Sequence, residues 1–299
     1  MKNSKENAAL QVLSLAWVLL AGTYGLSGSI PGPDSDTYVF CWLSAAAAAA
    51  LFWTAAVCNW RKDSSEITNK PVASALMGLY FFIAAAAFLR GLLSLWKQWA
   101  LADTPLLLLA AVASSVAVYG AQRGVRPVLR LCLPVALVAV ISFIIDTALL
   151  VPEMSLERLH LEYKCFDAPL FFKLLGSMLL PLPASLLLIN NDVKLTFPYH
   201  IAGALLGILY LAASAIRSVL LLGPLTVLEP FPLLDSLTLV YMGPALSRMD
   251  AWGLMALSAA MIASAMGLAA GGLLCLPPKW QGKTGSFIVA VVLTALVFF

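Results

Sequence analysis

Residues 131–145 read LCLPVALVAVISFII, and residues 106–118 read LLLLAAVASSVAV. Both stretches are apolar on every side, whereas the strands of a membrane barrel alternate apolar and polar residues over about 10 positions. In lipid an α-helix satisfies its own backbone hydrogen bonds, so an unbroken apolar stretch is stable there as a helix. These two stretches therefore predict membrane helices and exclude a barrel.

The composition agrees with a bilayer as the surrounding solvent. Of the 299 residues, 62% are hydrophobic and 11% are charged, which is far more apolar surface than water tolerates. A spanning helix needs roughly 20 apolar residues. Runs of about that length lie near residues 8–28, 38–59, 72–96, 104–122, 128–150, 169–189, 198–222, 250–276 and 284–299. We predict an all-α, polytopic membrane protein with about nine transmembrane helices.

The loop charges predict that the N-terminus lies inside, because Lys and Arg favour cytoplasmic loops. On the predicted inner side lie Lys2, Lys5, Arg61, Lys62, Lys70, Arg123, Arg126, Lys194, Lys279 and Lys283. The predicted outer loops carry Asp34, Asp36, Asp103, Glu229 and Asp235. A cleaved export signal is the alternative for the first run, with the same orientation. The net charge of +3 follows from this topology, and we expect no nucleic-acid partner.

Catalytic and metal-binding patterns do not emerge from the sequence. The five cysteines show no CxxC spacing and suit packing positions, while His160 and His200 fall on opposite sides of the predicted membrane. We expect neither an enzyme nor a metal or other cofactor. Asp146 is the one acid well inside an apolar run. For Arg90 and Arg217 we expect snorkelling to the outer surface, with pairing to Asp146 or the lining of a solute path as alternatives.

Two apolar runs are interrupted by residues that open a helix. The first contains Gly22-Thr23-Tyr24-Gly25-Leu26-Ser27-Gly28, and the sixth contains Pro181-Leu182-Pro183-Ala184-Ser185. Transporters with inverted repeats break the first helix of each repeat, so that freed N–H and C=O groups meet the solute. A five-helix repeat makes runs one and six equivalent. Two glycine pairs, Gly203 with Gly207 and Gly267 with Gly271, predict close helix approach.

Several short motifs carry a family resemblance. Thr104-Pro105, Tyr119-Gly120-Ala121-Gln122-Arg123-Gly124 and Arg130 stand in the fourth and fifth runs. Downstream follow Gly223-Pro224-Leu225-Thr226, Pro230-Phe231-Pro232 and Arg248-Met249-Asp250 before Trp252. In order and spacing, from about Tyr80 to Ala270, they resemble the spore germination permease family, the membrane B subunits of endospore germinant receptors.

The resemblance implies an amino-acid/polyamine/organocation transporter fold of two inverted five-helix repeats. Residues 1–299 would form a single permease-like domain, with repeat one over about 8–150 and repeat two over about 169–299. The implied ligand-binding residues, for a small amino acid or similar nutrient, are Gly22, Thr23, Gly25, Pro181, Pro183 and Ser185. The implied partners are the A-type and C-type receptor subunits, and the implied location is the inner membrane of the spore.

Departures from the family pattern keep other functions open. At the sixth-helix break relatives read Pro-Phe-Gly-Glu, whereas Ala184 and Ser185 stand here in place of the Gly and the acid. The ninth run, Ser286 to Phe299, has no successor, so we expect the tenth helix of the five-plus-five fold to be lacking. The alternatives are an amino-acid permease that moves solute and a divergent scaffold subunit that no longer binds ligand.

Overall fold

The computed structural model describes residues 2–27, 30, 32–59, 71–159, 166–189, 197–229, 231–238, 249–277 and 283–298. Within these ranges every regular element is a helix. The α-helices are α1 (Lys2–Gly22), α2 (Tyr24–Ser27), α3 (Ser35–Asn59), α5 (Pro71–Trp99), α6 (Leu106–Gln122), α7 (Val125–Leu150), α8 (Ala168–Leu179), α9 (Leu182–Ile189), α10 (Phe197–Leu222), α11 (Pro232–Leu237), α12 (Met249–Cys275) and α13 (Lys283–Phe298). The 3-10 turns are η1 (Val151–Glu153), η2 (Leu156–Arg158) and η4 (Gly223–Val227).

Each predicted apolar run corresponds to one helix or to a broken pair of helices. Seven segments of the described chain are long and apolar enough to cross a membrane: Ala8–Ser27, Ser35–Asn59, Val72–Trp99, Val125–Glu153, Ala168–Leu188, Phe197–Val227 and Ala251–Cys275. The apolar helices Leu106–Gln122 and Gly285–Phe298 are shorter than these. The predicted all-α, polytopic membrane architecture is therefore confirmed.

Much of the charge pattern that predicts the orientation lies outside the described residues. This applies to Arg61, Lys62, Lys70, Lys194 and Lys279. The N-terminus-inside orientation consequently stays a prediction from the sequence.

Side chains in the loops opposite the N-terminus define where several helices begin and end. Asp34 precedes α3 and its carboxylate accepts from the Thr37 backbone N–H at 2.7 Å. Asp167 caps α8 in the same way, accepting from the Leu170 N–H at 3.0 Å. Carboxylates satisfy the free N–H groups of a helix start and complement its dipole. At the end of α10, the Arg158 guanidinium donates to the carbonyl of Leu221.

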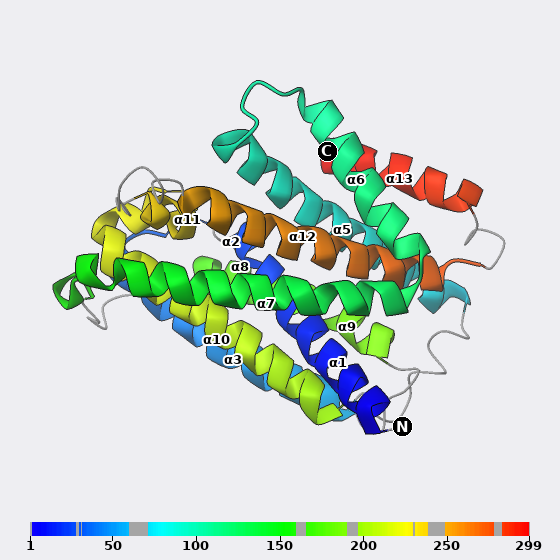
Figure 1. The fold of residues 1–299 in the computed structure, drawn as a ribbon, viewed down its shortest axis with the longest axis horizontal. Helices are drawn as coiled ribbons and strands as arrows, with labels where there is room; N and C mark the ends of the chain where they lie inside the picture. Colours follow the sequence, from blue (N-terminus) through cyan, green and yellow to red (C-terminus); the bar gives the residue numbers. More distant parts are fainter. Residues whose placement is uncertain are drawn as a thin grey trace.

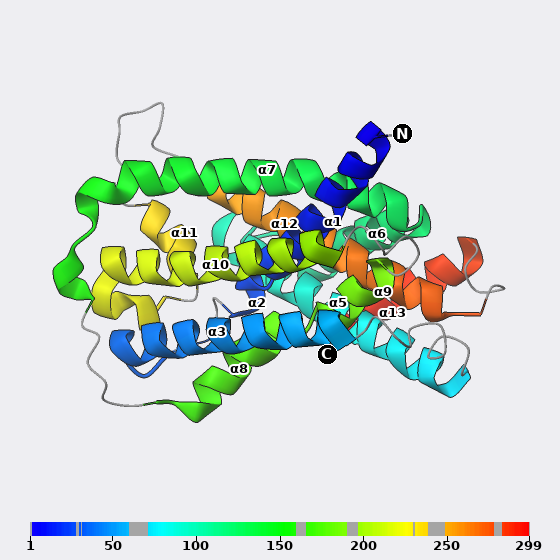
Figure 2. The ribbon, with the colours of Figure 1, turned by 90° about the horizontal axis from the view of Figure 1, so that it is seen from below.

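The helices are arranged around α1, which crosses the middle of the bundle (Figure 1). It contacts α7, α10 and α12, and its Leu15, Leu19 and Leu20 are fully buried. Figure 2 shows α3, α7 and α10 with nearly parallel axes, and α3 runs opposite to the other two. Helix α12 packs against α5, α6 and α7, and α13 packs against α5 and α6.

Glycines bring α1 and α10 into close contact, as their spacing predicts. A Cβ at Gly203 would overlap the Leu13 carbonyl, and its distance to the Leu13 Cα would be 2.9 Å. One turn further on, a Cβ at Gly207 would lie 2.8 Å from the Leu20 Cβ. The second pair borders side chains, since a Cβ at Gly271 would meet the Phe81 ring at 3.3 Å.

Candidate functional site

The first interruption predicted from the sequence is a break in the structure. Helix α1 ends at Gly22 and α2 begins at Tyr24, with Thr23 as the turn between them. The Thr23 N–H donates to the Leu20 carbonyl at 2.9 Å, a bond three residues back that tightens the turn. The Thr23 hydroxyl donates to the same carbonyl at 2.6 Å. Thr23 is fully buried, so this turn lies inside the protein.

The first break is held tightly against α12. A Cβ at Gly22 would overlap the Ser264 hydroxyl, and a Cβ at Gly25 would overlap the Met261 thioether. The Ser264 hydroxyl also lies 3.1 Å from the Val18 carbonyl, one turn before the break. Any larger side chain at Gly22 or Gly25 therefore has to displace the side chain of Ser264 or Met261.

The second predicted interruption is also a break, at Leu180 and Pro181 between α8 and α9. Pro181 and Pro183 have no N–H, so carbonyls of the preceding turn lose their helical partners. Two other carbonyls at the break, those of Met178 and Leu180, accept from side chains of other helices. The Trp53 indole N–H of α3 donates to the Met178 carbonyl at 3.2 Å, and the Tyr80 hydroxyl of α5 donates to the Leu180 carbonyl at 2.7 Å.

Ser185 is fully buried in the first turn of α9. Its N–H donates to the Pro181 carbonyl at 3.1 Å, and its hydroxyl donates to the Leu182 carbonyl at 2.7 Å. These bonds lie within the break itself and stabilise the start of α9.

The two broken helices contact each other crosswise. α1 touches α9, and α2 touches α8. Gly267 of α12 lies at one of these junctions, because a Cβ there would be 3.5 Å from Leu19 Cδ2 and 3.7 Å from Leu188 Cδ1. Gly22, Thr23 and Gly25 thus lie on one side of this crossing, and Pro181, Pro183 and Ser185 lie on the other.

A separate polar cavity lies between α7, α10, α11 and α12. Its volume is about 20 Å³. It is lined by Ala139, Ser142, Phe143, Asp146, Tyr210, Arg217, Leu233, Leu237, Gly253 and Ala256. Asp146 is 4% exposed and Arg217 is 3% exposed, so two opposite charges are buried around it. The prediction that Arg217 snorkels is wrong, whereas Arg90 is exposed as snorkelling requires.

Arg217 contacts two other residues of α7. Its Nη1 donates to the Thr147 hydroxyl at 3.0 Å, and its guanidinium carbon lies 4.9 Å from the centre of the Phe143 ring. Asp146 Oδ1 and Arg217 Nε have no hydrogen-bond partner among the described residues. Both residues line the cavity, and each retains a buried polar atom without a partner.

The polar cavity is connected to the first break. The Tyr24 hydroxyl accepts from the Leu233 N–H at 2.9 Å, and Leu233 lines the cavity from α11. Neither this role of Tyr24 nor the position of Tyr210 at the cavity is predicted from the sequence. A signal for Tyr210 exists, since it precedes Arg217 by seven residues, two helical turns, and so shares its face of α10.

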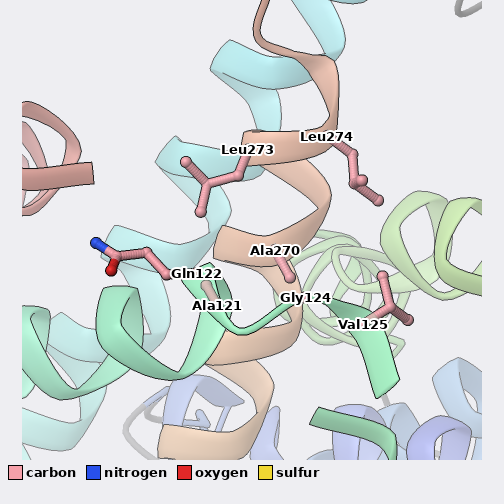
Figure 3. Close-up of a pocket in the computed structure, with 7 residues that line it drawn as sticks. All are labelled: Ala121, Gln122, Gly124, Val125, Ala270, Leu273 and Leu274. Carbon is pink, nitrogen blue, oxygen red and sulfur yellow. The ribbon is translucent and has the colours of Figure 1, made fainter. Parts of the chain in front are cut away.

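A pocket of about 120 Å³ lies at the opposite end of α7 (Figure 3). The α6–α7 turn and the end of α12 form its walls. The lining residues are Ala121, Gln122, Gly124, Val125, Ala270, Leu273 and Leu274. Figure 3 shows the Gln122 amide directed away from the other labelled side chains, which are all apolar.

This turn contains the Tyr119–Gly124 motif and has a defined geometry. The Arg123 guanidinium donates to the Tyr119 hydroxyl, and it lies 4.9 Å from the centre of that ring. Gly124 has φ +88°, a conformation that residues with a Cβ rarely adopt. At the other end of α6, Pro105 precedes the first helical residue, as a Thr-Pro helix start predicts.

Metal-binding clusters are not found in the described ranges, where three or more His, Cys, Asp or Glu residues nowhere come together. Cys41, Cys132 and Cys275 are buried free thiols. His160 and Cys165 lie outside the described residues. His200 is buried at the start of α10, with its ring centre 5.5 Å from that of Trp53.

Comparison with protein families gives a match to the family described as a spore germination protein, over residues 64–163. No curated protein matches the chain. The matched region includes α5, α6 and α7, and with them the Thr104-Pro105, Tyr119–Gly124 and Arg130 motifs. The family resemblance predicted from the sequence is therefore confirmed for this part of the chain. The downstream motifs from Gly223 onward lie beyond the match.

Proposed function

We propose, from the spore germination protein match over residues 64–163, that this integral membrane protein is a permease-like subunit of a germinant receptor. It binds a small amino acid or similar nutrient at the two helix breaks and helps to trigger germination. The observation that carries the proposal is the crosswise contact of two broken helices. A broken helix is tolerated at membrane depth where it is buried in protein or lines a solute cavity.

The helix contacts support two inverted repeats, over about 8–150 and 169–299. In such a pair α1 corresponds to α8 with α9, α3 to α10, α5 to α12 and α6 to α13. If each helix is replaced by its counterpart in the other repeat, the α1–α10 contact becomes the contact of α8 with α3. The α6–α12 contact becomes the α13–α5 contact in the same way. All four of these contacts occur. The α3–α10, α5–α12 and α6–α13 contacts convert into themselves, and they occur as well.

In this proposal the ligand is held by opened backbone groups. Gly22 and Gly25 supply them from the first break, on either side of the Thr23 turn, and Pro181, Pro183 and Ser185 border the second. An N–H group at the start of a half-helix favours a carboxylate, and a freed carbonyl favours an ammonium group. The partners are A-type and C-type receptor subunits in the inner spore membrane, with the N-terminus inside.

The test uses the chain assembled with these two subunits. Thermal unfolding is measured with a panel of amino acids, and we expect a specific, saturable rise in the unfolding temperature with at least one of them. Gly25→Trp is expected to abolish the rise, because the new side chain fills the space beside Met261. Gly176→Trp is the control, since a Cβ at Gly176 meets nothing within 4 Å.

Two outcomes count against the proposal. If a correctly assembled complex shows no shift with any amino acid, ligand binding is refuted and the chain is a scaffold subunit. If Gly25→Trp keeps the shift, the ligand does not use the first break. Uptake of a labelled amino acid by vesicles that contain this chain alone would favour an ordinary permease.

A further inference from the structure

Asp146 and Arg217 pose a physical problem that the proposed function does not solve. Both are more than nine-tenths buried, carry opposite charges and line one cavity, and each has an atom without a hydrogen-bond partner in the described structure. A buried charge is stable when its polar atoms are paired. The atoms without a partner are an acceptor, Asp146 Oδ1, and a donor, Arg217 Nε. A ligand that satisfies both must donate one hydrogen bond and accept another.

The size of the cavity limits which molecule can bind in it. Its volume is about 20 Å³. A buried water needs roughly 10 to 15 Å³ and two to four polar partners. Asp146, Arg217, Tyr210 and Ser142 provide four polar side chains around this space. An amino acid is several times too large for it, whereas one water fits.

Helix α11 covers the cavity, with Leu233 and Leu237 as part of its lining. Both side chains are buried. The Leu233 N–H lies in the first turn of α11, where an N–H has no partner within the helix. It donates instead to the Tyr24 hydroxyl in α2. Tyr24 is fully buried beside Gly25, and its ring stacks at 6.3 Å on the ring of Trp42. A rigid residue of the first break therefore fixes the position of α11.

We propose that Asp146 and Arg217 bind a single water molecule inside the membrane, and that α11, held by the Tyr24 hydroxyl, closes this site. The water accepts from Arg217 Nε and donates to Asp146 Oδ1, which joins α7 to α10 where the two charges do not pair directly. The site includes none of the proposed ligand-binding residues, although Tyr24 connects it to the first break. It requires neither a solute nor the receptor partners.

Radiolytic labelling tests the water directly. X-rays convert a bound water into hydroxyl radicals that oxidise the adjacent side chains, which mass spectrometry then locates. In the wild-type chain in lipid nanodiscs we expect several-fold faster oxidation of Tyr210 than of Tyr80. Tyr80 is a matched control, because it is also partly buried but does not line this cavity. Equal oxidation of the two tyrosines would overturn the water site.

A double variant provides the second comparison for the water. Asp146→Leu combined with Arg217→Met removes both charged partners, and we expect Tyr210 oxidation to fall to the level of Tyr80. Persistent fast oxidation in a cooperatively folded double variant would show that the two charges do not hold the water.

Accessibility of Ser142 tests the closure by α11. Ser142→Cys places a thiol at the cavity wall, and a charged, membrane-impermeant thiol reagent reports its access to water by peptide mass spectrometry. We expect slow modification, and about fivefold faster modification when Tyr24→Phe is added, the effect of losing one hydrogen bond on an opening equilibrium. Tyr80→Phe is the control that removes a hydroxyl at the sixth-helix break. Fast modification without Tyr24→Phe, or equal acceleration by both variants, would refute the closure.

Discussion

Replacement of Gly203 by alanine tests how closely α1 and α10 approach each other. A Cβ at Gly203 would overlap the Leu13 carbonyl oxygen, and it would lie 2.9 Å from both the carbonyl carbon and the Cα of Leu13. These are backbone atoms, so no change of rotamer relieves the overlap, and the two helices have to move apart. The movement would loosen the contact that buries α1.

The expected magnitude follows from two opposing terms. Overpacking costs about 1 to 3 kcal/mol, and a backbone clash belongs at the upper end of that range. Alanine returns about 1 kcal/mol through its better helix propensity. We therefore expect Gly203→Ala to lower the free energy of unfolding by about 2 kcal/mol. Gly207→Ala is expected to cost less, because its nearest neighbour is the Leu20 side chain.

The assay is equilibrium unfolding of the purified full chain in mixed micelles. Tryptophan fluorescence is a suitable signal, since Trp17 is 3% exposed on α1 and its ring centre lies 5.2 Å from that of Tyr210. Gly176→Ala is the matched control, in open space on α8, with an expected gain of about 0.5 to 1 kcal/mol. Equal stability of Gly203→Ala and Gly176→Ala would refute the close approach of the two helices.

Three further changes test other parts of the structure by the same unfolding measurement. Arg217→Met is expected to cost about 3 to 5 kcal/mol because it leaves Asp146 buried and unpaired, and adding Asp146→Leu is expected to recover most of this; additive losses would contradict the coupling. Burial, with a further contribution from Glu229, raises the pKa of Asp235 to about 6. The folded state thus binds this proton more tightly than the unfolded chain does, so stability rises as the pH falls from about 7 to 4. Asp235→Asn is expected to remove this pH dependence and to raise the free energy of unfolding at pH 7.5 by about 1 kcal/mol, a value reduced because Asp235 is partly exposed. An unchanged pH dependence would show that other groups cause it. Tyr80→Phe removes the donor to the Leu180 carbonyl and is expected to cost about 1 kcal/mol, and a neutral result would show that this break needs no such partner.

Local features of the sequence were sufficient to predict the helices and both breaks. Apolar length predicts a spanning helix wherever it falls, and Pro181 with Pro183 cannot continue the hydrogen-bond ladder of α8. Gly22 and Gly25 likewise indicate the first break, and there the glycines also make room for α12. Each of these predictions depends on residues close together in the chain.

The polar cavity could not be predicted in the same way, because it depends on contacts between distant residues. A helix that is apolar all round does not show which side faces protein, so Arg217 could equally have reached the surface. Its burial follows from Thr147 and Phe143, which lie 70 or more positions earlier. The Tyr24 hydroxyl has its partner 209 residues away, at Leu233.

The missing acid at the sixth-helix break and the buried charges of Asp146 and Arg217 together limit where a ligand can be recognised. Ala184 and Ser185 bring no charge to that break, and the carbonyls of Met178 and Leu180 already accept from Trp53 and Tyr80. The buried carboxylate of Asp146 lies instead on α7, opposite a guanidinium and in a cavity the size of a water. Neither the carbonyls at the sixth-helix break nor the Asp146 carboxylate is therefore free to hold the ammonium of an amino acid.

Recognition in the proposed function consequently depends more on the first break than on the second. There the glycines border α12 side chains, and Met261 is a flexible side chain that can move to admit a ligand. Substitutions at Gly25 are thus the sharper test of binding. Ser185→Ala, which removes a hydroxyl bonded to its own helix, is expected to reduce the amino-acid-dependent shift in unfolding temperature less than Gly25→Trp does. Loss of that shift in Ser185→Ala would return the ligand to the sixth-helix break and refute this assignment.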